Sequence, residues 1–168
     1  MKYSIIIPCY NEYNNLLVLL DKIKIILDQN KNLQIVIVNN GSTDDTSNLL
    51  KKYKLQNLKF VILKKNLGYG GGIKAGINSI NTDIICWTHA DEQVKIEDVV
   101  NILKKHEKNF HQTFFIKGKR KKRRIIDFLF TKLMSIFVFI ICQARLNDIN
   151  GQPKIFHKNL KNYLIDNS

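Results

Sequence analysis

Three side chains that can act as ligands occupy alternate positions in the segment WTHADEQ, residues 87–93, which directly follows the apolar run DIIC. Alternate side chains of an extended segment point to the same side, so His89, Asp91 and Gln93 would all face one spot. An imidazole, a carboxylate and an amide in one place suit a ligand site or a metal site. The same residues also suit a solvated loop that leads into a helix, and the segment alone supports both interpretations.

Two other polar segments follow apolar runs nearer the N-terminus, PCYNE at 8–12 and NNGSTDD at 39–45. Tyr10 can stack on a nucleobase, and Glu12 can accept a hydrogen bond from a base or a ribose. The amides of Asn39 and Asn40 can pair with the edge of a base or cap a turn. Taken singly, Glu12 is an ordinary acid at a helix start, and the two amides are ordinary turn residues.

A glycine-rich segment, NLGYGGGIKAG at 66–76, contains the spacing G-x-G-x-x-A at Gly70, Gly72 and Ala75. This is a weak form of the dinucleotide-binding fingerprint, which normally follows the first strand of a sheet. Here it follows the third apolar run, and the first turn has no glycine, which disfavours a nicotinamide-binding domain. The glycines still allow a close backbone approach, either to a ligand or within a tight loop.

The segments that must position these side chains alternate between apolar, strand-like runs and helical patterns. The sequence predicts strands at 3–8, 33–38, 58–63, 83–87 and 113–118, and helices at 12–29, 44–54, 71–80 and 96–108. Pro8 is expected to end the first strand, and Ser42, three residues before Asp45, suits a helix N-cap. Continuous apolar strands between helices are typical of an α/β fold, with a mostly parallel sheet and helices on both faces.

Ligands bind beyond the carboxyl ends of the strands in such a sheet. Each polar segment follows one predicted strand: 8–12 follows the first, 39–45 the second, 66–72 the third and 89–93 the fourth. We therefore expect four loops to meet at one edge of the sheet.

The chain has 168 residues, enough for a domain with a real core, and a net charge of +13. Seven of its 27 basic residues lie in KGKRKKRR at 117–124. A dense basic cluster implies a polyanionic neighbour: phosphates, an acidic membrane surface or nucleic acid. A nucleic-acid-binding module would explain this cluster but none of the four loops, and aromatic residues do not alternate with the charges as in single-strand binders.

The three cysteines, Cys9, Cys86 and Cys142, are far apart and lack metal-binding spacing, which indicates reduced thiols in a cytosolic-type compartment. The apolar stretch at the N-terminus is too short for a signal peptide. Nine of the ten residues 133–142 are apolar, which is short of the roughly 20 needed to span a bilayer. The segment 125–146 therefore suits either a buried helix or an interfacial helix flanked by cations.

Five segments, in order, resemble the motifs of the nucleotide-sugar-dependent family 2 glycosyltransferases: SIIIPCYNE, IVIVNNGSTDDT, NLGYGGGIKAG, THADEQ and LNDINGQPKIF. Each is weak by itself, but their order and spacing cover about residues 3–157. Within the family the chain is most similar to the polyprenyl-phosphate sugar transferases, typified by dolichol-phosphate mannose synthase. The resemblance implies a Rossmann-like GT-A fold, with a nucleotide-sugar-binding core at 1–118 and a basic, apolar and acceptor-side segment at 119–168.

The resemblance also implies roles for single residues. Positions that bind the nucleotide match Pro8, Tyr10, Glu12, Asn39, Asn40, Asn66, Gly68 and Lys74. The metal-binding motif of the DxD type matches His89, Asp91 and Gln93. The phosphate and acceptor side matches Lys117, Arg120, Arg123, Gln152 and Lys154, together with Asp148, Asn150 and Gly151. In three places, Asn39, Asn40 and His89, this chain replaces an acid that the family usually has.

The implied activity is the inverting transfer of a sugar from a UDP- or GDP-sugar to a polyprenyl phosphate or another membrane-linked acceptor. A divalent cation on Asp91, together with Lys and Arg side chains, would neutralise the leaving diphosphate. Imidazole suits manganese better than magnesium, so His89 predicts a manganese preference. A phosphate acceptor is already ionised, whereas a hydroxyl acceptor needs a base, for which Asp148 is the candidate.

We expect the protein to lie in the cytoplasm, at the cytosolic face of a membrane with an anionic surface, without a nucleic-acid partner. A second interpretation is a non-catalytic relative that only binds nucleotide or membrane. The missing acids favour it, as does a chain that ends at Ser168, earlier than is usual in the family.

Overall fold

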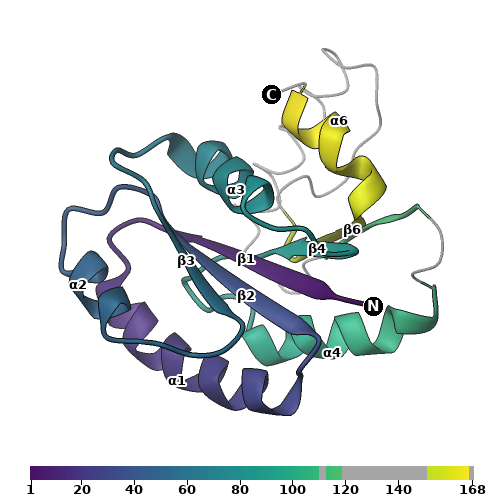
Figure 1. Cartoon of the computed structure of the whole chain (residues 1–168), viewed down its shortest axis with the longest axis horizontal. Coiled ribbons are helices and arrows are strands. Elements are labelled where there is room, and N and C mark those ends of the chain that lie inside the picture. Colours follow the sequence, from purple (N-terminus) through teal and green to yellow (C-terminus); the bar gives the residue numbers. More distant parts are fainter. Residues whose placement is uncertain (110–112, 119–150, 167–168) are drawn as a thin grey trace, which may run out of the picture.

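A central sheet with helices on both sides is formed by residues 1–109, 113–118 and 151–166, which are the residues that the computed structural model describes (Figure 1). The strands are β1 (Tyr3–Cys9), β2 (Leu33–Asn39), β3 (Leu58–Ile62), β4 (Ile84–Trp87), β5 (Phe115–Lys117) and β6 (Lys154–His157). The helices are α1 (Tyr13–Gln29), α2 (Thr46–Lys51), α3 (Gly68–Asn78), α4 (Ile96–His106) and α6 (Lys161–Asp166). Short 3-10 turns, η1 (Glu107–Asn109) and η2 (Lys158–Leu160), follow α4 and β6.

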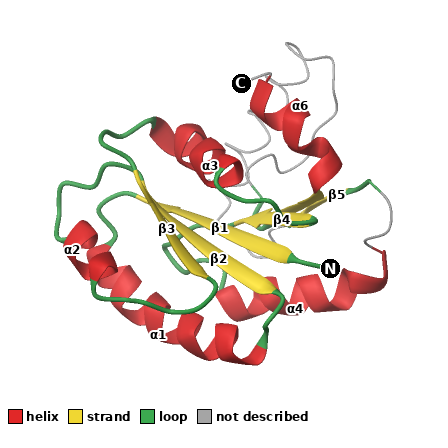
Figure 2. Cartoon of the chain, viewed as in Figure 1, coloured by secondary structure: helices red, strands yellow, loops and turns green. Residues whose placement is uncertain are grey.

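The sheet has the strand order β3-β2-β1-β4-β6-β5 (Figure 2). β1 pairs in parallel with both β2 and β4, and β2 pairs in parallel with β3. β6 runs antiparallel to both β4 and β5. The prediction of a mostly parallel α/β sheet is therefore confirmed.

The core lies on both faces of β1. Ile5 and Ile7 point into the cluster that α1 and α4 cover, whereas Ile6 points into the cluster that α3 covers. All three isoleucines are fully buried. In Figure 1, α1, α2 and α4 lie on one side of the sheet, and α3 and α6 lie on the other. A parallel strand covered on both faces has no polar side, which explains its continuous apolar run.

Pro8 lies within β1 rather than ending it, so the prediction of a stop at this residue is wrong. Proline cannot donate the hydrogen bond that holds neighbouring strands together. The pairing of β1 with β4 runs only as far as Ile6 opposite Trp87. Since Pro8 lies past this pairing, the missing N–H removes no bond to β4.

The sequence did not predict β6 or α6. The segment KIFH has only four residues, too few to show a strand pattern, and the sequence analysis assigned it to an acceptor-side motif. It enters the sheet because Ile155 and Phe156 are fully buried, one on each face, next to β4.

The apolar segment 125–146 lies outside the described residues, as does the predicted boundary at 118/119 between the core and an acceptor-side segment. Among the helices that the structure does describe, none combines the length and the apolarity needed to cross a bilayer.

Replacing Gly76 by alanine should destabilise the fold. A Cβ at Gly76 would lie 2.4 Å from Cγ2 of Ile6 and 3.0 Å from Cγ2 of Val38, and β-branched side chains in a packed strand have little freedom to move. We expect the free energy of unfolding to fall by about 1–3 kcal/mol, measured by urea denaturation. The matched control is Gly70→Ala, where a Cβ meets no atom within 4 Å. Equal stability of the two variants would contradict this packing.

Candidate active site

A hollow of about 230 Å³ opens at the carboxyl ends of β1, β2 and β4, next to the loop that follows β3. It lies where the strand order reverses between β1 and β4, the usual ligand site of an open parallel sheet. The lining residues come from all four loops: Pro8, Cys9, Tyr10, Glu12, Asn40, Asn66, Gly68, Tyr69, His89, Ala90 and Asp91. The expected meeting of four loops at one edge is thus confirmed, and we call this hollow the loop pocket.

Side chains of the first two loops hold each other in place. The backbone N–H of Asn11 donates to Ser42 Oγ (3.0 Å), and Asn11 Oδ1 accepts from the backbone N–H of Thr43 (2.8 Å). Asp44 Oδ2 accepts from the backbone N–H of Tyr13 (3.2 Å). The prediction that Ser42 caps α2 is therefore wrong, because its hydroxyl joins the β2 loop to the β1 loop instead.

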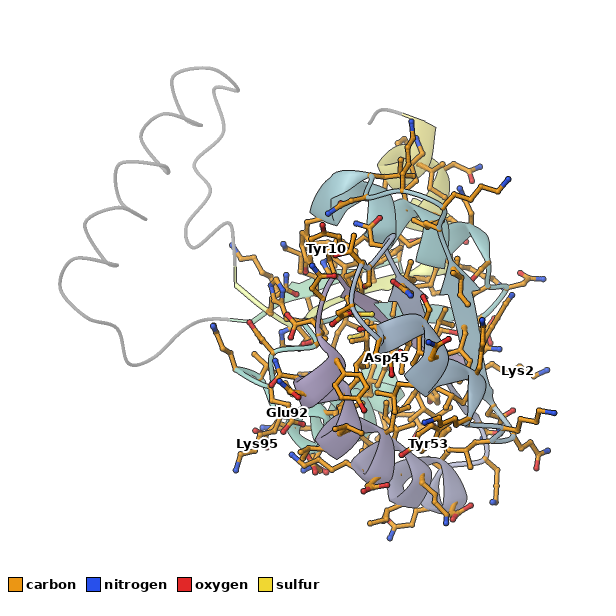
Figure 3. The ribbon with its side chains drawn as sticks, turned by 90° about the vertical axis from the view of Figure 1, so that its left-hand side faces the viewer. Lys2, Tyr10, Asp45, Tyr53, Glu92 and Lys95 are labelled. Atoms are coloured by element: carbon orange, nitrogen blue, oxygen red, sulfur yellow. The ribbon has the colours of Figure 1, made fainter. Side chains whose placement is uncertain are left out.

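The first loop also presents two of the predicted nucleotide contacts. Tyr10 lines the loop pocket and is 43% exposed (Figure 3). Glu12 lines the loop pocket, and its Oε2 accepts a hydrogen bond from Asn15 Nδ2 (2.5 Å). Glu12 is thus an acid at the start of α1, as its simpler interpretation predicted. It also lines the loop pocket.

Asn39, the last residue of β2, is fully buried and uses its amide inside the protein. Its Nδ2 donates to Ser47 Oγ (2.7 Å), and its Oδ1 accepts from the backbone N–H of Ser42 (2.9 Å). Both halves of the amide are therefore engaged in shaping the β2 loop, which agrees with the turn interpretation of this residue.

Asn40 ties the β2 loop to the glycine-rich loop. Its Nδ2 donates both to Asn66 Oδ1 (3.0 Å) and to the carbonyl of Gly68 (2.8 Å). Its Oδ1 accepts from the backbone N–H of Leu67 (3.0 Å). A carboxylate cannot donate, so an acid at this position would lose two of these three bonds. The amide in place of the family's usual acid therefore has a structural explanation in this chain.

Gly41 lets the same two loops come into contact. Its φ is +72°, a conformation that residues with a Cβ rarely adopt. A Cβ there would also lie 2.4 Å from the carbonyl carbon of Lys65. The backbone of the β2 loop is thus close enough to the β3 loop to exclude any side chain at this point.

The loop after β4 bends at residues 90–94 and is not extended. His89 and Asp91 line the loop pocket, whereas Gln93 is exposed and lies outside the lining. Asp91 Oδ1 accepts a hydrogen bond from the backbone N–H of Gln93 (3.1 Å). The expectation of an extended segment is therefore wrong, because the backbone bends here, and the metal role of Gln93 stays a prediction.

Glu92 takes part in this bend. Its φ is +55°, which is costly for a residue with a Cβ. Its carboxylate forms an ion pair with Lys22 of α1, and Figure 3 shows Glu92 beside that helix. The two side chains are only 24% and 31% exposed, so water screens this pair less than a fully exposed one.

Tyr69 is a pocket residue that the sequence analysis did not single out. Its ring stacks on the ring of His89, with centroids 4.7 Å apart and an interplanar angle of 12°. Its hydroxyl oxygen lies 3.4 Å from His89 Nε2 and accepts a hydrogen bond from Gln152 Nε2 (3.2 Å). An aromatic residue inside a glycine-rich segment was the only signal in the sequence, and the folded chain alone shows that it meets His89 and Gln152.

Burial keeps two weakly acidic groups of the loop pocket protonated. It raises the pKa of the Cys9 thiol to about 12, and the charges of Glu12 and Asp44 add to the effect. Burial also raises the pKa of the Tyr69 hydroxyl, which the nearby Asp91 carboxylate raises further. Neither group is ionised near neutral pH, so Cys9 does not act as a thiolate nucleophile.

The other predicted site residues lie elsewhere. Lys74 lies on α3 and lines a second hollow rather than the loop pocket. Lys117 and Lys154 lie opposite each other on β5 and β6. The predictions for Arg120, Arg123, Asp148 and Asn150 fall on residues that the structure does not describe.

Asp91 and His89 give the loop pocket one carboxylate and one imidazole. In the described parts of the chain, no group of three His, Cys, Asp or Glu side chains could hold a metal ion. Magnesium commonly binds through one or two carboxylates together with the phosphates of a substrate. The donor set therefore fits a cation shared with a bound diphosphate, and it does not fit a metal centre built only from protein side chains.

An open, mostly parallel sheet with a pocket at the reversal of its strand order defines a Rossmann-like α/β domain. The model of the family described as Glycosyl transferase family 2 matches residues 4–159. The chain therefore belongs to glycosyltransferase family 2, which confirms the resemblance of its five motifs.

A curated relative agrees with this membership. The undecaprenyl-phosphate 4-deoxy-4-formamido-L-arabinose transferase of Photorhabdus laumondii is 30% identical over 138 residues, which cover 80% of this chain and 41% of the relative. The chain spans 38%, 41% and 50% of the length of three curated relatives.

Two solved structures share the fold at low sequence identity. The mannosyltransferase PcManGT of Pyrobaculum calidifontis, in complex with GDP-Man and Mn²⁺, has a TM-score of 0.65 at 19% identity, covering 97% of this chain and 46% of that one. The glucosyl-3-phosphoglycerate synthase of Mycobacterium tuberculosis, with Mn²⁺, UDP and phosphoglyceric acid, has a TM-score of 0.67 at 14% identity, covering 95% and 56%. The predicted GT-A fold is thereby confirmed.

Asn40→Asp should destabilise the protein. The change removes two donated hydrogen bonds from a buried side chain and places carboxylate oxygens against the oxygen atoms of Asn66 and Gly68. We expect the free energy of unfolding to fall by about 1–3 kcal/mol in urea denaturation. The matched control is Asn14→Asp, which makes the same chemical change at an exposed position of α1. An equal cost at both positions would show that the Asn40 bonds do not hold the loops.

Asp44 should give the protein a pH-dependent contribution to stability. Burial alone would raise the pKa of Asp44, but hydrogen bonds from Thr46 and from the Tyr13 N–H outweigh it and lower the pKa below 3.8. A carboxylate with a depressed folded-state pKa stabilises the fold above its ordinary pKa, and loses this effect as the pH falls through the folded-state value.

Asp44→Asn should therefore lower the urea midpoint near neutral pH. The gap between variant and wild type should shrink as the pH falls below the ordinary Asp pKa of 3.8. A gap that stays constant over that range would rule out a role for the Asp44 charge.

Proposed function

We propose that this protein is an inverting glycosyltransferase that moves a sugar from a UDP- or GDP-sugar to a polyprenyl phosphate or another membrane-linked acceptor. The observation that carries the proposal is the meeting of all four loops in one pocket, with Asp91 and His89 facing the first and third loops. Family membership supports the reaction class, and the name of the P. laumondii relative supports a lipid phosphate acceptor.

The nucleotide end of the donor would lie against Pro8, Tyr10, Glu12, Asn66 and Gly68, which line the pocket together. Asn40 would act indirectly, since its amide is engaged with the glycine-rich loop. Base recognition would then depend on how Asn40 positions that loop rather than on a direct contact from this amide. The solved relatives carry GDP-Man in one case and UDP in another, and we retain both bases.

The phosphate end of the donor would lie beside Asp91 and His89. A divalent cation held by these two residues would offset the charge that develops on the leaving diphosphate. Asp91 is already oriented by the Gln93 N–H, and His89 is oriented by its stack on Tyr69. We propose manganese as the preferred ion, because one of the two protein ligands is an imidazole.

The acceptor decides whether the protein must remove a proton. A phosphate oxygen is ionised at neutral pH and attacks without a base, whereas a hydroxyl needs one. A base role for Asp148 stays a prediction, as do the acceptor-side roles of Arg120 and Arg123. We further propose a peripheral position at the cytosolic face of a membrane, where a lipid acceptor and the basic run at 117–124 would meet anionic head groups.

A second candidate function is donor binding without turnover. The observation that favours it is that two usual acids of the family are amides engaged in loop structure, while His89 stands in place of a third acid. Single-turnover assays separate the two candidates. A non-catalytic relative would bind the donor and leave the bond between its sugar and its diphosphate intact.

Replacing Asp91 should abolish cation-dependent use of the donor. Asp91→Asn removes the only carboxylate among the pocket residues of the β4 loop, so we expect release of nucleoside diphosphate to fall on the order of 100-fold or more. The assay uses a panel of UDP- and GDP-sugars, a polyprenyl phosphate, and manganese or magnesium. His89→Ala should lower the ratio of the manganese rate to the magnesium rate.

Asp28→Asn is the control, because it makes the same chemical change at an exposed position of α1 that lies outside the pocket lining. It should keep most of the activity and the same metal preference. The proposal fails if no UDP- or GDP-sugar binds in the presence of manganese, or if Asp91→Asn matches the wild type.

A further inference from the structure

The loop that follows β4 is held on both sides of Asp91. Ala90, directly before Asp91, is 3% exposed and belongs to the core cluster that α1 and α4 cover. Glu92, directly after Asp91, forms an ion pair with Lys22 of α1, which is 70 residues away in the sequence. Figure 3 shows Glu92 beside that helix. The main chain on each side of Asp91 is therefore fixed by a contact with the body of the protein.

The ion pair acts on an unfavourable backbone conformation. Glu92 has a φ of +55°, in the left-handed region, where the Cβ of an L-residue is crowded by the backbone. A residue stays in such a conformation only when its surroundings restrain it. Glycine would adopt this φ without strain, but the chain has a glutamate here, whose side chain reaches Lys22. The same residue therefore makes the bend and supplies the contact that holds it.

Lys22 interacts with acids at both ends of this loop. The hydrogen bond that Lys22 donates to Glu92 raises the pKa of Lys22, although burial acts in the opposite direction, and the charge of Glu97 raises it as well. Glu97 lies in the first turn of α4. Within the described part of the chain, Oε1 of Glu92 and Oε2 of Glu97 are buried without a hydrogen-bond partner. Lys22 thus offsets negative charge both at the bend and at the start of α4.

We propose that Lys22 and Glu92 are positioning residues for the cation site of the loop pocket. The pair keeps the β4 loop bent at Glu92, so that the carboxylate of Asp91 faces the pocket before a donor or a cation arrives. Neither Lys22 nor Glu92 lines the pocket, so the pair acts through Asp91 rather than on the ligand. This assignment rests on the proposed glycosyltransferase function and adds to it a residue of α1, outside the pocket.

The bend and the direction of the Asp91 carboxylate are connected by one hydrogen bond. The backbone N–H of Gln93, on the far side of the bend, donates to Asp91 Oδ1 (3.1 Å). An opening of the bend at Glu92 would break this bond and release the carboxylate. The loop would then have to become ordered when the cation binds, and conformational freedom that is lost on binding opposes affinity. Loss of the ion pair should therefore weaken cation binding.

Millisecond hydrogen exchange on the full chain, without any ligand, tests whether the pair holds the loop. Lys22→Met should speed exchange of the Gln93 amide by about fivefold or more, because local opening of the bend sets this rate. Lys22→Arg should keep most of the protection, since arginine is always charged. Lys24→Met is the matched control, because it removes a lysine from an exposed position of the same helix and should leave the rate unchanged.

Binding of Mn²⁺ in the presence of UDP or GDP, followed by the EPR signal of the free ion, tests the effect on the cation site. Lys22→Met and Glu92→Gln should each raise the Kd for Mn²⁺ by about five- to tenfold. The double variant should be little worse than either single one, because partners in one interaction are not additive. Lys22→Arg should restore most of the affinity. Binding of the nucleotide without Mn²⁺ should stay the same in every variant.

The outcomes separate the positioning pair from the proposed function. Unchanged exchange or unchanged Mn²⁺ affinity in Lys22→Met would overturn the assignment, even if the wild type transfers sugar. An equal effect of Lys24→Met, or a loss of nucleotide binding without Mn²⁺ in Lys22→Met, would also overturn it, because the change would then act on the whole fold. Faster exchange in Lys22→Met, in a protein whose wild type binds no Mn²⁺ with either nucleotide, would support the hold on the loop and count against the transferase.

Discussion

The position of β1 between β2 and β4 is the constraint on which the rest of the structure depends. Parallel pairing brings the carboxyl ends of these strands to one edge, and the loop pocket opens there, where the strand order reverses at β1. The loops after all four parallel strands must therefore meet around this pocket. The isoleucines that bury β1 on both faces thus decide where chemistry can take place, although they lie in the core.

Side-chain amides turn this meeting of loops into a defined pocket. Asn40 and Asn11 bond to groups of another loop, and Asn39 bonds to Ser42 and Ser47 in the segment that follows β2. A buried polar group left unsatisfied would cost stability. Two residues that depart from the family's usual acids, Asn39 and Asn40, are therefore part of the loop structure. His89 differs from them, because its ring faces the pocket and is held by Tyr69.

The loop pocket meets one physical demand of the proposed reaction. The loop pocket is bordered by carboxylate, imidazole and amide groups, which suit a charged nucleotide and its cation.

The sequence by itself determined the α/β class, the parallel core and the edge at which the loops meet, because buried parallel strands leave continuous apolar runs and each loop follows its strand directly. It also identified Asp91 and His89, whose types suit a cation and whose loop follows a strand. Only the tertiary structure decided that the backbone bends at Gln93, that Tyr69 stacks on His89 and that Asn40 acts within the loops. It also placed the four-residue strand β6 beside β4. These features depend on contacts between distant segments, and a turn or a short strand leaves no periodic pattern from which such contacts can be read.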